Sequence, residues 1–298
     1  SESNENILNR TKFRLSAIDN PGGTGVKDIR YKFDTEPDQQ NIYTDGVSYY
    51  DTGDFDIPEG TTKIYYWAID GANNVEVPKS KDIVVDDDAP QITIILSPSQ
   101  PSQTGWYNKE TGSPEMTIQT DEPNTPNDTQ SGLKEIRYDL TGSQTPANLY
   151  TSPVTLPDGE HNIVVMAVDN LNNAETVPYG IVKVDTKEPG ISVSRTGRNV
   201  TIDVNDPVPS SGIDSIYYFT TNDANKIPTD ADWTQILTGN SITFLLPEGH
   251  NKVWYKAKDK AGNETNPDSK VFVAEMEPPV SSISIKGSPI SDKVKTGD

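Results

Sequence analysis

The sequence predicts an all-β protein made of antiparallel β-sandwich domains in tandem. Three observations lead to this prediction: one unit occurs three times, apolar residues alternate with period two inside it, and turn residues separate the alternating runs. No stretch shows a 3.6-residue apolar period over a dozen residues. We therefore expect no helix beyond single turns.

The repeated unit contains two blocks, and each block keeps its internal spacing. The first block reads Gly-Val-Lys-Asp-Ile-Arg-Tyr in its first copy, and its copies occupy 25–31, 132–138 and 212–218. The second block begins with a Pro-Glu/Asp-Gly turn whose prolines are Pro58, Pro157 and Pro247, 99 and 90 residues apart. This period is too long for a solenoid and is typical of immunoglobulin-like sandwich domains.

The strand after each Pro-Glu/Asp-Gly turn sorts its residues onto two faces. One row is apolar in every copy, as in Ile163, Val165 and Ala167, and we expect it to face the core. The alternate row varies between copies and includes Trp67, Val164 and Trp254. We expect this second row to face outward.

Short acidic segments that end in proline separate the copies, at 86–90, 185–189 and 275–279. Each precedes a β-rich run that we interpret as the first strand of a new domain. The first copy lacks such a strand, since its run at 12–18 aligns with the second strands at 115–120 and 199–204. We predict domains at 1–86 (first strand missing), 87–185 and 186–276, with the start of a further repeat at 277–298. These domains would form an elongated array, as an excerpt from a longer chain.

The composition excludes several classes of function. The chain has 25 Lys and Arg against 45 Asp and Glu, a net charge of −20, which disfavours binding to nucleic acid or anionic lipid. It has no cysteine for a disulfide or thiolate site, and no apolar run near the ~18 residues of a membrane helix, so we expect no membrane insertion in this segment. His161 and His250 are too few for a triad or a zinc site, and we interpret them as surface turn residues. We expect no catalytic site.

Carboxylates gather where the incoming linker, the loop after the second strand and the last hairpin should meet at one pole of a sandwich. The second repeat offers Asp86, Asp87, Asp88, Asp121, Glu122 and Asp169. The third repeat offers Asp185, Glu188, Asp203, Asp206 and Asp259. Crowded carboxylates repel one another, and Ca²⁺ prefers six to eight hard oxygen ligands, so these residues are candidate calcium ligands at the domain junctions. The alternative is that they are solvated loop acids, with Asp70, Asp169 and Asp259 capping their own turns.

Aromatic residues raise a second possibility, because exposed rings bind sugars by stacking. Trp67 and Trp254 fall on the row that we expect to face outward, and Trp106 and Trp233 fall near loops. The alternative is that these rings pack under loops or against a neighbouring domain. Their positions do not recur across the copies, which favours the alternative.

The blocks Ser-Gly-aliphatic, Ile-x-Tyr, Pro-x-Gly and Ala-x-Asp-x-x-Gly-Asn-x-Glu resemble the tandem Ig-like repeats of bacterial and archaeal surface-layer proteins and large adhesins. They are also similar to leptospiral outer-membrane Ig-like repeats. The resemblance covers roughly 11–276 and departs from the Gly-Asn turn at Asn73 and Asn172, where asparagine tolerates the left-handed region.

The resemblance implies an extracellular location, at a cell surface or in a cell wall, and a structural role in a lattice or a stalk. Implied partners are neighbouring repeats of the same chain, further copies in a self-assembled surface array, or cell-surface glycans. Two other interpretations stay open, because fold does not fix function. One is an accessory or carbohydrate-binding region of a secreted glycan-active enzyme, and the other is an adhesin that grips a protein through a strand edge.

Overall fold

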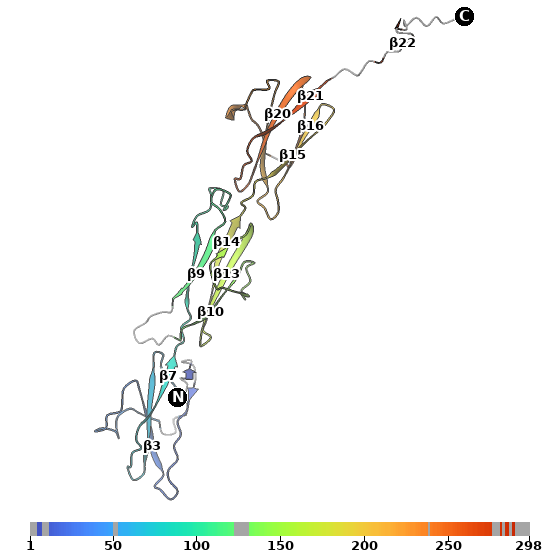
Figure 1. Ribbon diagram of the computed structural model, residues 1–298. Helices are drawn as coiled ribbons and strands as arrows, with labels where there is room; N and C mark the ends of the chain where they lie inside the picture. Colours follow the sequence, from blue (N-terminus) through green and yellow to red (C-terminus); the bar gives the residue numbers. More distant parts are fainter. Residues whose placement is uncertain are drawn as a thin grey trace. The chain divides into compact units, whose positions relative to one another are not determined.

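The computed structural model describes residues 5–7, 12–49, 53–121, 131–237, 239–275, 281, 284–285 and 288–289. The chain forms two compact units, one of Ser1–Tyr107 with Thr111–Val184 and one of Asn108–Glu110 with Asp185–Asp298. Strands dominate both units (Figure 1), and within the described ranges the helical content is one three-residue 3-10 turn, η1 (Asp230–Asp232). The prediction of an all-β chain of tandem immunoglobulin-like sandwiches is confirmed.

Unit 1 begins with two sheets. Their strands are β1 (Glu5–Ile7), β2 (Lys12–Phe13), β3 (Val26–Phe33), β4 (Val47–Ser48), β5 (Phe55–Asp56), β6 (Lys63–Asp70) and β7 (Lys79–Val85). One sheet has the order β1-β7-β6-β3-β4, and the other pairs β2 with β5. The buried residues between them are Ile57, Ile64, Ile83 and Val85.

The rest of unit 1 is a second, larger sandwich. Its strands are β8 (Gln91–Ser97), β9 (Glu115–Asp121), β10 (Leu133–Asp139), β11 (Asn148–Leu149), β12 (Val154–Thr155), β13 (Gly159–Asp169) and β14 (Ala174–Val184). The sheets have the orders β11-β10-β13-β14 and β12-β9-β8. Met116, Leu156, Ile163 and Val165 are fully buried between them.

Unit 2 repeats the same plan. Its strands are β15 (Gly190–Thr196), β16 (Asn199–Asn205), β17 (Ile213–Thr221), β18 (Thr234–Ile236), β19 (Ser241–Leu245), β20 (Gly249–Asp259) and β21 (Asp268–Ala274), followed by β22 (Ser284–Ile285) and β23 (Ser288–Pro289). The sheets have the orders β15-β16-β19 and β18-β17-β20-β21, with β22 and β23 as a separate pair. Val200, Ile202, Ile216 and Leu246 are buried in the core.

The predicted inner row is fully buried in the second repeat and partly buried in the first and third, and the predicted outer row is partly wrong. Ile163, Val165 and Ala167 are buried as expected, yet Trp67 is 0% exposed and Val164 is also buried. Trp67 packs with Ile42 and Ile69, and its indole Nε1 donates a hydrogen bond to the Ile42 carbonyl at 3.2 Å. The loop between β3 and β4 therefore covers the face that the alternation alone assigned to solvent.

The turns agree with the sequence. Asn73 and Asn172 have φ values of 67° and 69°, and Gly262 at the matching position of unit 2 has 95°. Asparagine and glycine are the residues that enter the left-handed region most readily, so the substitution of one for the other preserves the hairpin.

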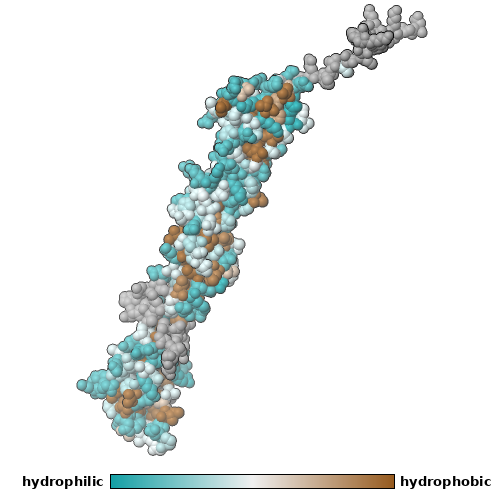
Figure 2. Space-filling model, viewed as in Figure 1, coloured by the Kyte–Doolittle hydropathy of each residue, from teal (hydrophilic) through white to brown (hydrophobic). Residues whose placement is uncertain are grey.

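The visible face of the molecule is mainly hydrophilic, with apolar residues in small separate groups (Figure 2). This surface fits the net charge of −20, which favours solubility and attracts cations.

Candidate metal centre

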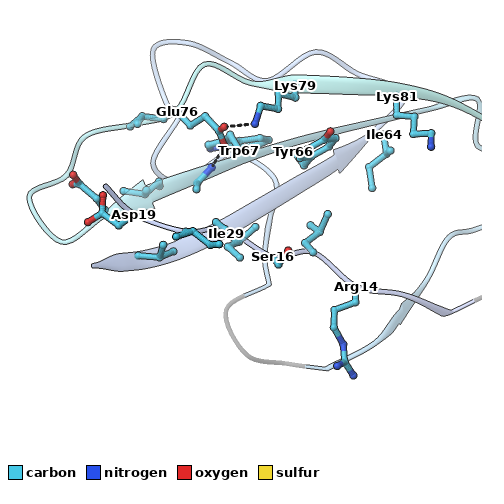
Figure 3. Close-up of a pocket in the computed structure, with 18 of the residues that line it drawn as sticks. Arg14, Ser16, Asp19, Ile29, Ile64, Tyr66, Trp67, Glu76, Lys79 and Lys81 are labelled. Atoms are coloured by element: carbon cyan, nitrogen blue, oxygen red, sulfur yellow. Dashed lines mark hydrogen bonds and ion pairs between the residues drawn. The ribbon is translucent and has the colours of Figure 1, made fainter. Parts of the chain in front are cut away.

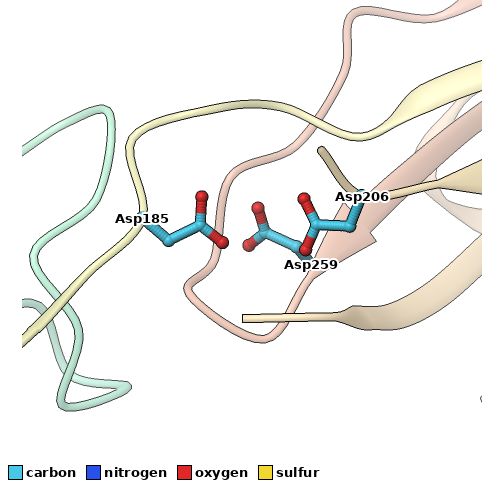
Figure 4. A group of neighbouring side chains, drawn as sticks. All are labelled: Asp185, Asp206 and Asp259. Carbon is cyan, nitrogen blue, oxygen red and sulfur yellow. The ribbon is translucent and has the colours of Figure 1, made fainter. Parts of the chain in front are cut away.

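Three aspartates of unit 2 come together at the start of its sandwich (Figure 4). Asp185 is the first residue after β14, Asp206 directly follows β16, and Asp259 is the last residue of β20. Each offers a carboxylate oxygen, and these oxygens lie within 4.8 Å of one another. Asp185 is 0% exposed and Asp259 is 1% exposed, whereas Asp206 is half-buried.

Backbone amides and one asparagine hold these carboxylates in place. Asp185 accepts hydrogen bonds from the backbone amides of Ser211 at 2.7 Å and Lys187 at 3.3 Å. Asp259 accepts from the backbone amide of Asn263 at 2.8 Å and from its side-chain Nδ2 at 2.7 Å. These donors to the carboxylates of Asp185 and Asp259 are neutral groups.

Asp206 is held in the same way, since its Oδ2 accepts from the Gly212 amide at 2.7 Å. Asn263 also donates from Nδ2 to the Asp185 carbonyl at 2.8 Å, so one asparagine connects two of the three acidic positions. The sequence placed Asn263 in the Gly-Asn turn of the repeated motif. It did not predict the hydrogen bond from Asn263 to the Asp185 carbonyl, because the two residues are 78 positions apart.

The environment makes the charge of Asp259 unfavourable. The pKa of Asp259 is raised to about 6, mainly by burial, with smaller contributions from the charges of Asp185 and Asp206, against the lowering effect of the hydrogen bonds from Asn263. Two buried carboxylates beside a third favour a positive partner. A divalent cation fits this donor set, because the three carboxylates supply hard oxygen ligands of the kind that Ca²⁺ prefers.

Unit 1 contains the same arrangement one domain earlier. Asp86 is 1% exposed and Asp169 is 0% exposed. The Ser131 amide donates to Asp86 Oδ2 at 2.8 Å, as the Ser211 amide does to Asp185. Asn173 Nδ2 donates to Asp169 Oδ2 at 2.8 Å and to the Asp86 carbonyl at 3.0 Å, as Asn263 does to its own two aspartates.

In the sequence, the residue that corresponds to Asp206 in this earlier group is Glu122. Asp121 pairs with Gln91 at the end of its ladder, and Asn205 pairs with Gly190 at the end of the corresponding ladder. Glu122 follows Asp121 in the sequence as Asp206 follows Asn205. Glu122 lies outside the described residues.

The first repeat keeps two of the three positions. Asp19 Oδ2 accepts from the Gly25 amide at 2.6 Å, six residues ahead, as Asp206 accepts from Gly212. Asp70 accepts from the backbone amides of Ala72 and Asn74 and from Asn74 Nδ2, and these bonds with Asn74 lower the pKa of Asp70. Asp19 was absent from the sequence prediction. The six-residue spacing to the glycine of the first block, which Asp19 shares with Asp206, is the signal that could have identified it.

The remaining predicted ligands lie apart from the three-carboxylate group. Asp87 and Asp88 are half-buried, and the Asp88 amide donates to Asp86 Oδ1 at 3.2 Å. Asp121 is exposed at the end of β9. Asp203 is exposed within β16 and accepts from Ser241 Oγ at 2.6 Å. Glu188 forms an ion pair with Lys109 at 2.5 Å.

The tryptophans do not form a shared stacking platform within the described residues. Trp254 donates from Nε1 to the Lys226 carbonyl at 3.1 Å, and Lys252 Nζ lies 4.4 Å from its ring centroid. Lys256 and Lys183 lie in the same way over Trp233 and Trp106, at 5.1 and 5.3 Å. Cationic side chains thus occupy ring faces that a sugar would need.

One histidine differs from its predicted role. His161 lies within β13 and is buried, and its Nε2 is 2.7 Å from the Pro157 carbonyl. In unit 2, Asn251 makes the equivalent bond to the Pro247 carbonyl at 2.8 Å. His161 is therefore a buried hydrogen-bonding residue rather than a surface turn residue.

Comparisons with known proteins found one kind of solved structure with low similarity to this chain. No family model matches this chain, and no curated protein matches it. A solved structure of fibronectin(III)-like modules of Clostridium thermocellum CbhA is similar at 12% identity, with a TM-score of 0.25, over 63% of this chain and 100% of that chain. Within the described residues, no helix has the length and apolar character needed to cross a membrane.

Proposed function

We propose that this chain is a non-catalytic structural module of a large extracellular protein of a cell surface or cell wall, in a surface-layer lattice or an adhesin stalk, whose sandwiches bind Ca²⁺. The observation that supports this proposal is the group of Asp185, Asp206 and Asp259, whose carboxylate oxygens converge and in which two carboxylates are fully buried.

Electrostatics favours a cation at this group. Removing a carboxylate from water is costly unless an opposite charge compensates it. Here three carboxylates share one small volume, so a single divalent cation would neutralise most of their mutual repulsion. Calcium suits the group better than magnesium, since Ca²⁺ accepts irregular oxygen shells whereas Mg²⁺ demands near-ideal octahedral geometry.

Recurrence supports a general structural role. The buried pair Asp86 and Asp169 in unit 1 reproduces the hydrogen bonds of Asp185 and Asp259 in unit 2. A catalytic site needs a unique set of residues, whereas a repeated site at the start of each domain serves the architecture of the chain. Extracellular calcium modules bind with Kd values of about 10⁻⁴–10⁻³ M, which matches the free calcium outside cells.

The position of Asp185 in the chain suggests that a bound cation would restrict backbone motion between the two units. It directly follows Val184, the last residue of unit 1. A cation held by Asp185, Asp206 and Asp259 would fix the backbone at which the chain passes from one unit to the other. We therefore expect Ca²⁺ to narrow the distribution of inter-unit distances as well as to stabilise the fold.

Thermal unfolding in 2 mM Ca²⁺ and in EDTA, together with small-angle scattering, tests the proposal. We expect a higher Tm in Ca²⁺, because a ligand present at 100 times its Kd stabilises the folded state by about 2.7 kcal/mol. Asp206→Asn should reduce the calcium response, whereas Asp203→Asn should retain it. The second variant is a matched control, since it removes the same charge from an exposed position outside the group. Coincident curves in Ca²⁺ and EDTA would rule out the calcium site.

A further inference from the structure

Three residues of unit 2 come from a part of the chain that otherwise belongs to unit 1. Asn108–Glu110 group with Asp185–Asp298, although they lie between β8 and β9 in the sequence. Asn108 is 6% exposed, and a buried polar side chain normally has hydrogen-bond partners. The partners of Asn108 and of its neighbour Lys109 lie beside the three-carboxylate group.

Segment 108–110 bonds to the hairpin at 259–263, which follows β20. Asn108 Nδ2 donates to the Ala261 carbonyl at 3.0 Å, and the Lys109 amide donates to Asn263 Oδ1 at 2.7 Å. The Glu110 amide donates to Asn108 Oδ1 at 3.1 Å, which holds the Asn108 side chain in this orientation. Ala261 and Asn263 are both buried. The hairpin that carries Asp259 is therefore held at two of its five positions by segment 108–110.

The base of such a hairpin is fixed by residues close to it in sequence. In the first sandwich of unit 1, Glu76 accepts from the Ala68 amide at 3.2 Å and forms an ion pair with Lys79 at 2.6 Å (Figure 3). In unit 2, Thr265 Oγ1 accepts from the corresponding Ala257 amide at 3.0 Å. These local bonds fix the hairpin on its own strands, but they do not fix it against the segment that carries Asp185.

Asn263 joins the hairpin to that segment. Its Nδ2 donates to the Asp185 carbonyl at 2.8 Å and to Asp259 Oδ2 at 2.7 Å. An asparagine amide has donors at one end and an acceptor at the other. Because the Lys109 amide donates to Oδ1, the Nδ2 end stays directed at the two aspartates. Half a turn of the amide would place its oxygen against the Asp259 carboxylate and its NH2 group against the Lys109 N–H.

Asn108 is connected to the buried acids by a second route. The Ala261 carbonyl accepts from Asn108, and the Ala261 amide donates to Ser211 Oγ at 3.0 Å. The Ser211 amide in turn donates to Asp185 Oδ2 at 2.7 Å. Ala261 is thus held between Asn108 and the residue that orients the Asp185 carboxylate.

We propose that Asn108 and Lys109 are positioning residues of the calcium site, which hold the Asp259 hairpin and the Asp185 segment together before the cation binds. The proposal rests on the proposed function of the same site. Neither residue binds the cation, since each acts through Ala261 or Asn263. Ligands that are held in place in advance do not have to be ordered by the cation, so binding is tighter. Loss of a bond that orients a metal ligand typically weakens metal binding by about 10–100-fold.

Two replacements of Lys109 separate its amide from its ammonium group. Lys109→Pro removes the N–H that donates to Asn263, together with the ion pair between Lys109 and Glu188. Lys109→Ala removes only the ion pair, in which the lysine side chain is 62% exposed, and is the matched control. We expect the calcium Kd of Lys109→Pro to exceed that of Lys109→Ala by about 10–100-fold. Lys109→Ala should stay within about threefold of the parent protein, because an exposed ion pair contributes little.

Isothermal titration calorimetry with CaCl2 on the full chain measures these Kd values. Every protein in the series, the parent included, carries Asp169→Asn, which disables the corresponding group of unit 1, so that the titration reports on unit 2. Thermal unfolding in EDTA is the second measurement. A purely structural role of Lys109 would lower the Tm of Lys109→Pro in EDTA and leave its Kd equal to that of Lys109→Ala.

The outcomes separate this proposal from the proposed function. Equal Kd values for Lys109→Pro and Lys109→Ala would overturn the positioning role and leave the calcium site standing, whatever the Tm in EDTA. A parent protein that binds no Ca²⁺ would overturn both. If Lys109→Pro does not fold, Asn108→Ala decides in its place, since it removes the donor to Ala261 and keeps the backbone. A Kd of Asn108→Ala equal to the parent value would then overturn the proposal.

Discussion

Asp259 should make the calcium-free protein less stable as the pH rises from 5 to 7. Its folded-state pKa is raised from 3.8 to about 6, mainly by burial. An acid with a raised folded-state pKa binds its proton more tightly in the folded protein than in the unfolded chain. Its destabilising effect is therefore absent at low pH, develops as the pH rises from about 4 through 6, and is constant above.

The structure gives the size of this effect. A shift of about 2 pKa units, at about 1.4 kcal/mol each, corresponds to about 3 kcal/mol for a fully desolvated group. Part of this loss develops below pH 5, because the unfolded carboxyl group already ionises near 3.8, so we expect a loss of about 1–2 kcal/mol between pH 5 and 7.

Urea denaturation in EDTA, followed by tryptophan fluorescence at several pH values, measures the free energy of unfolding. The comparison is between the natural chain and Asp259→Asn, which is neutral at every pH. The test uses the difference between the two proteins in how the free energy of unfolding changes with pH. Taking this difference removes the contributions of the histidines and of distant acids, which are the same in both proteins. In saturating Ca²⁺ the slope of the natural chain should become flat or reversed, since the cation favours the ionised carboxylate. Parallel profiles for the two proteins in EDTA would refute the electrostatic reasoning about this site.

Three further predictions concern stability, each measured by the same denaturation method. Ile216→Ala removes a fully buried side chain and should cost about 2–5 kcal/mol, whereas exposed Val208→Ala should change stability by less than about 0.5 kcal/mol; equal losses would contradict the assigned core. Asn172→Val should lower the free energy of unfolding by about 1–3 kcal/mol, because the backbone at position 172 has a φ of 69°, and Asn172→Gly should leave it nearly unchanged. A valine variant as stable as the natural chain would exclude the left-handed turn. Trp67→Ala should lower the free energy of unfolding by about 3–5 kcal/mol. Trp67→Phe should lower it less, since phenylalanine keeps most of the packing but loses the hydrogen bond to the Ile42 carbonyl. An alanine variant of unchanged stability would mean that the loop does not cover this face of the strand.

The local pattern of the sequence was sufficient for the strands and the turns. Alternation with period two identified the row of Ile163, Val165 and Ala167 as core, and these residues are buried. The equivalence of asparagine and glycine predicted the left-handed conformation of Asn73 and Asn172. Both properties depend on neighbouring residues only, so a repeated sequence is enough to determine them.

The covering of the outer face depended on contacts that are distant in sequence. Alternation shows that a strand has two different faces, but it does not show what lies over each face. Trp67 is buried by Ile42, 25 residues earlier in the chain, and Val164 is buried although its row varies between copies. Loops that fold back over a sheet leave no periodic signal at the strand that they cover.

The sequence by itself determined that acids gather at the start of each domain, since the order of strands places those segments at one pole. Only the tertiary structure selected Asp185, Asp206 and Asp259 from the larger set. Asp203 lies three residues before Asp206, but it falls within β16 and faces solvent, whereas Asp206 lies beyond the end of the strand. The physical reason is that metal ligation requires side-chain oxygens to converge within a few ångströms. That convergence is set by where each strand ends and by which long-range hydrogen bonds orient each carboxylate, not by the residue types alone.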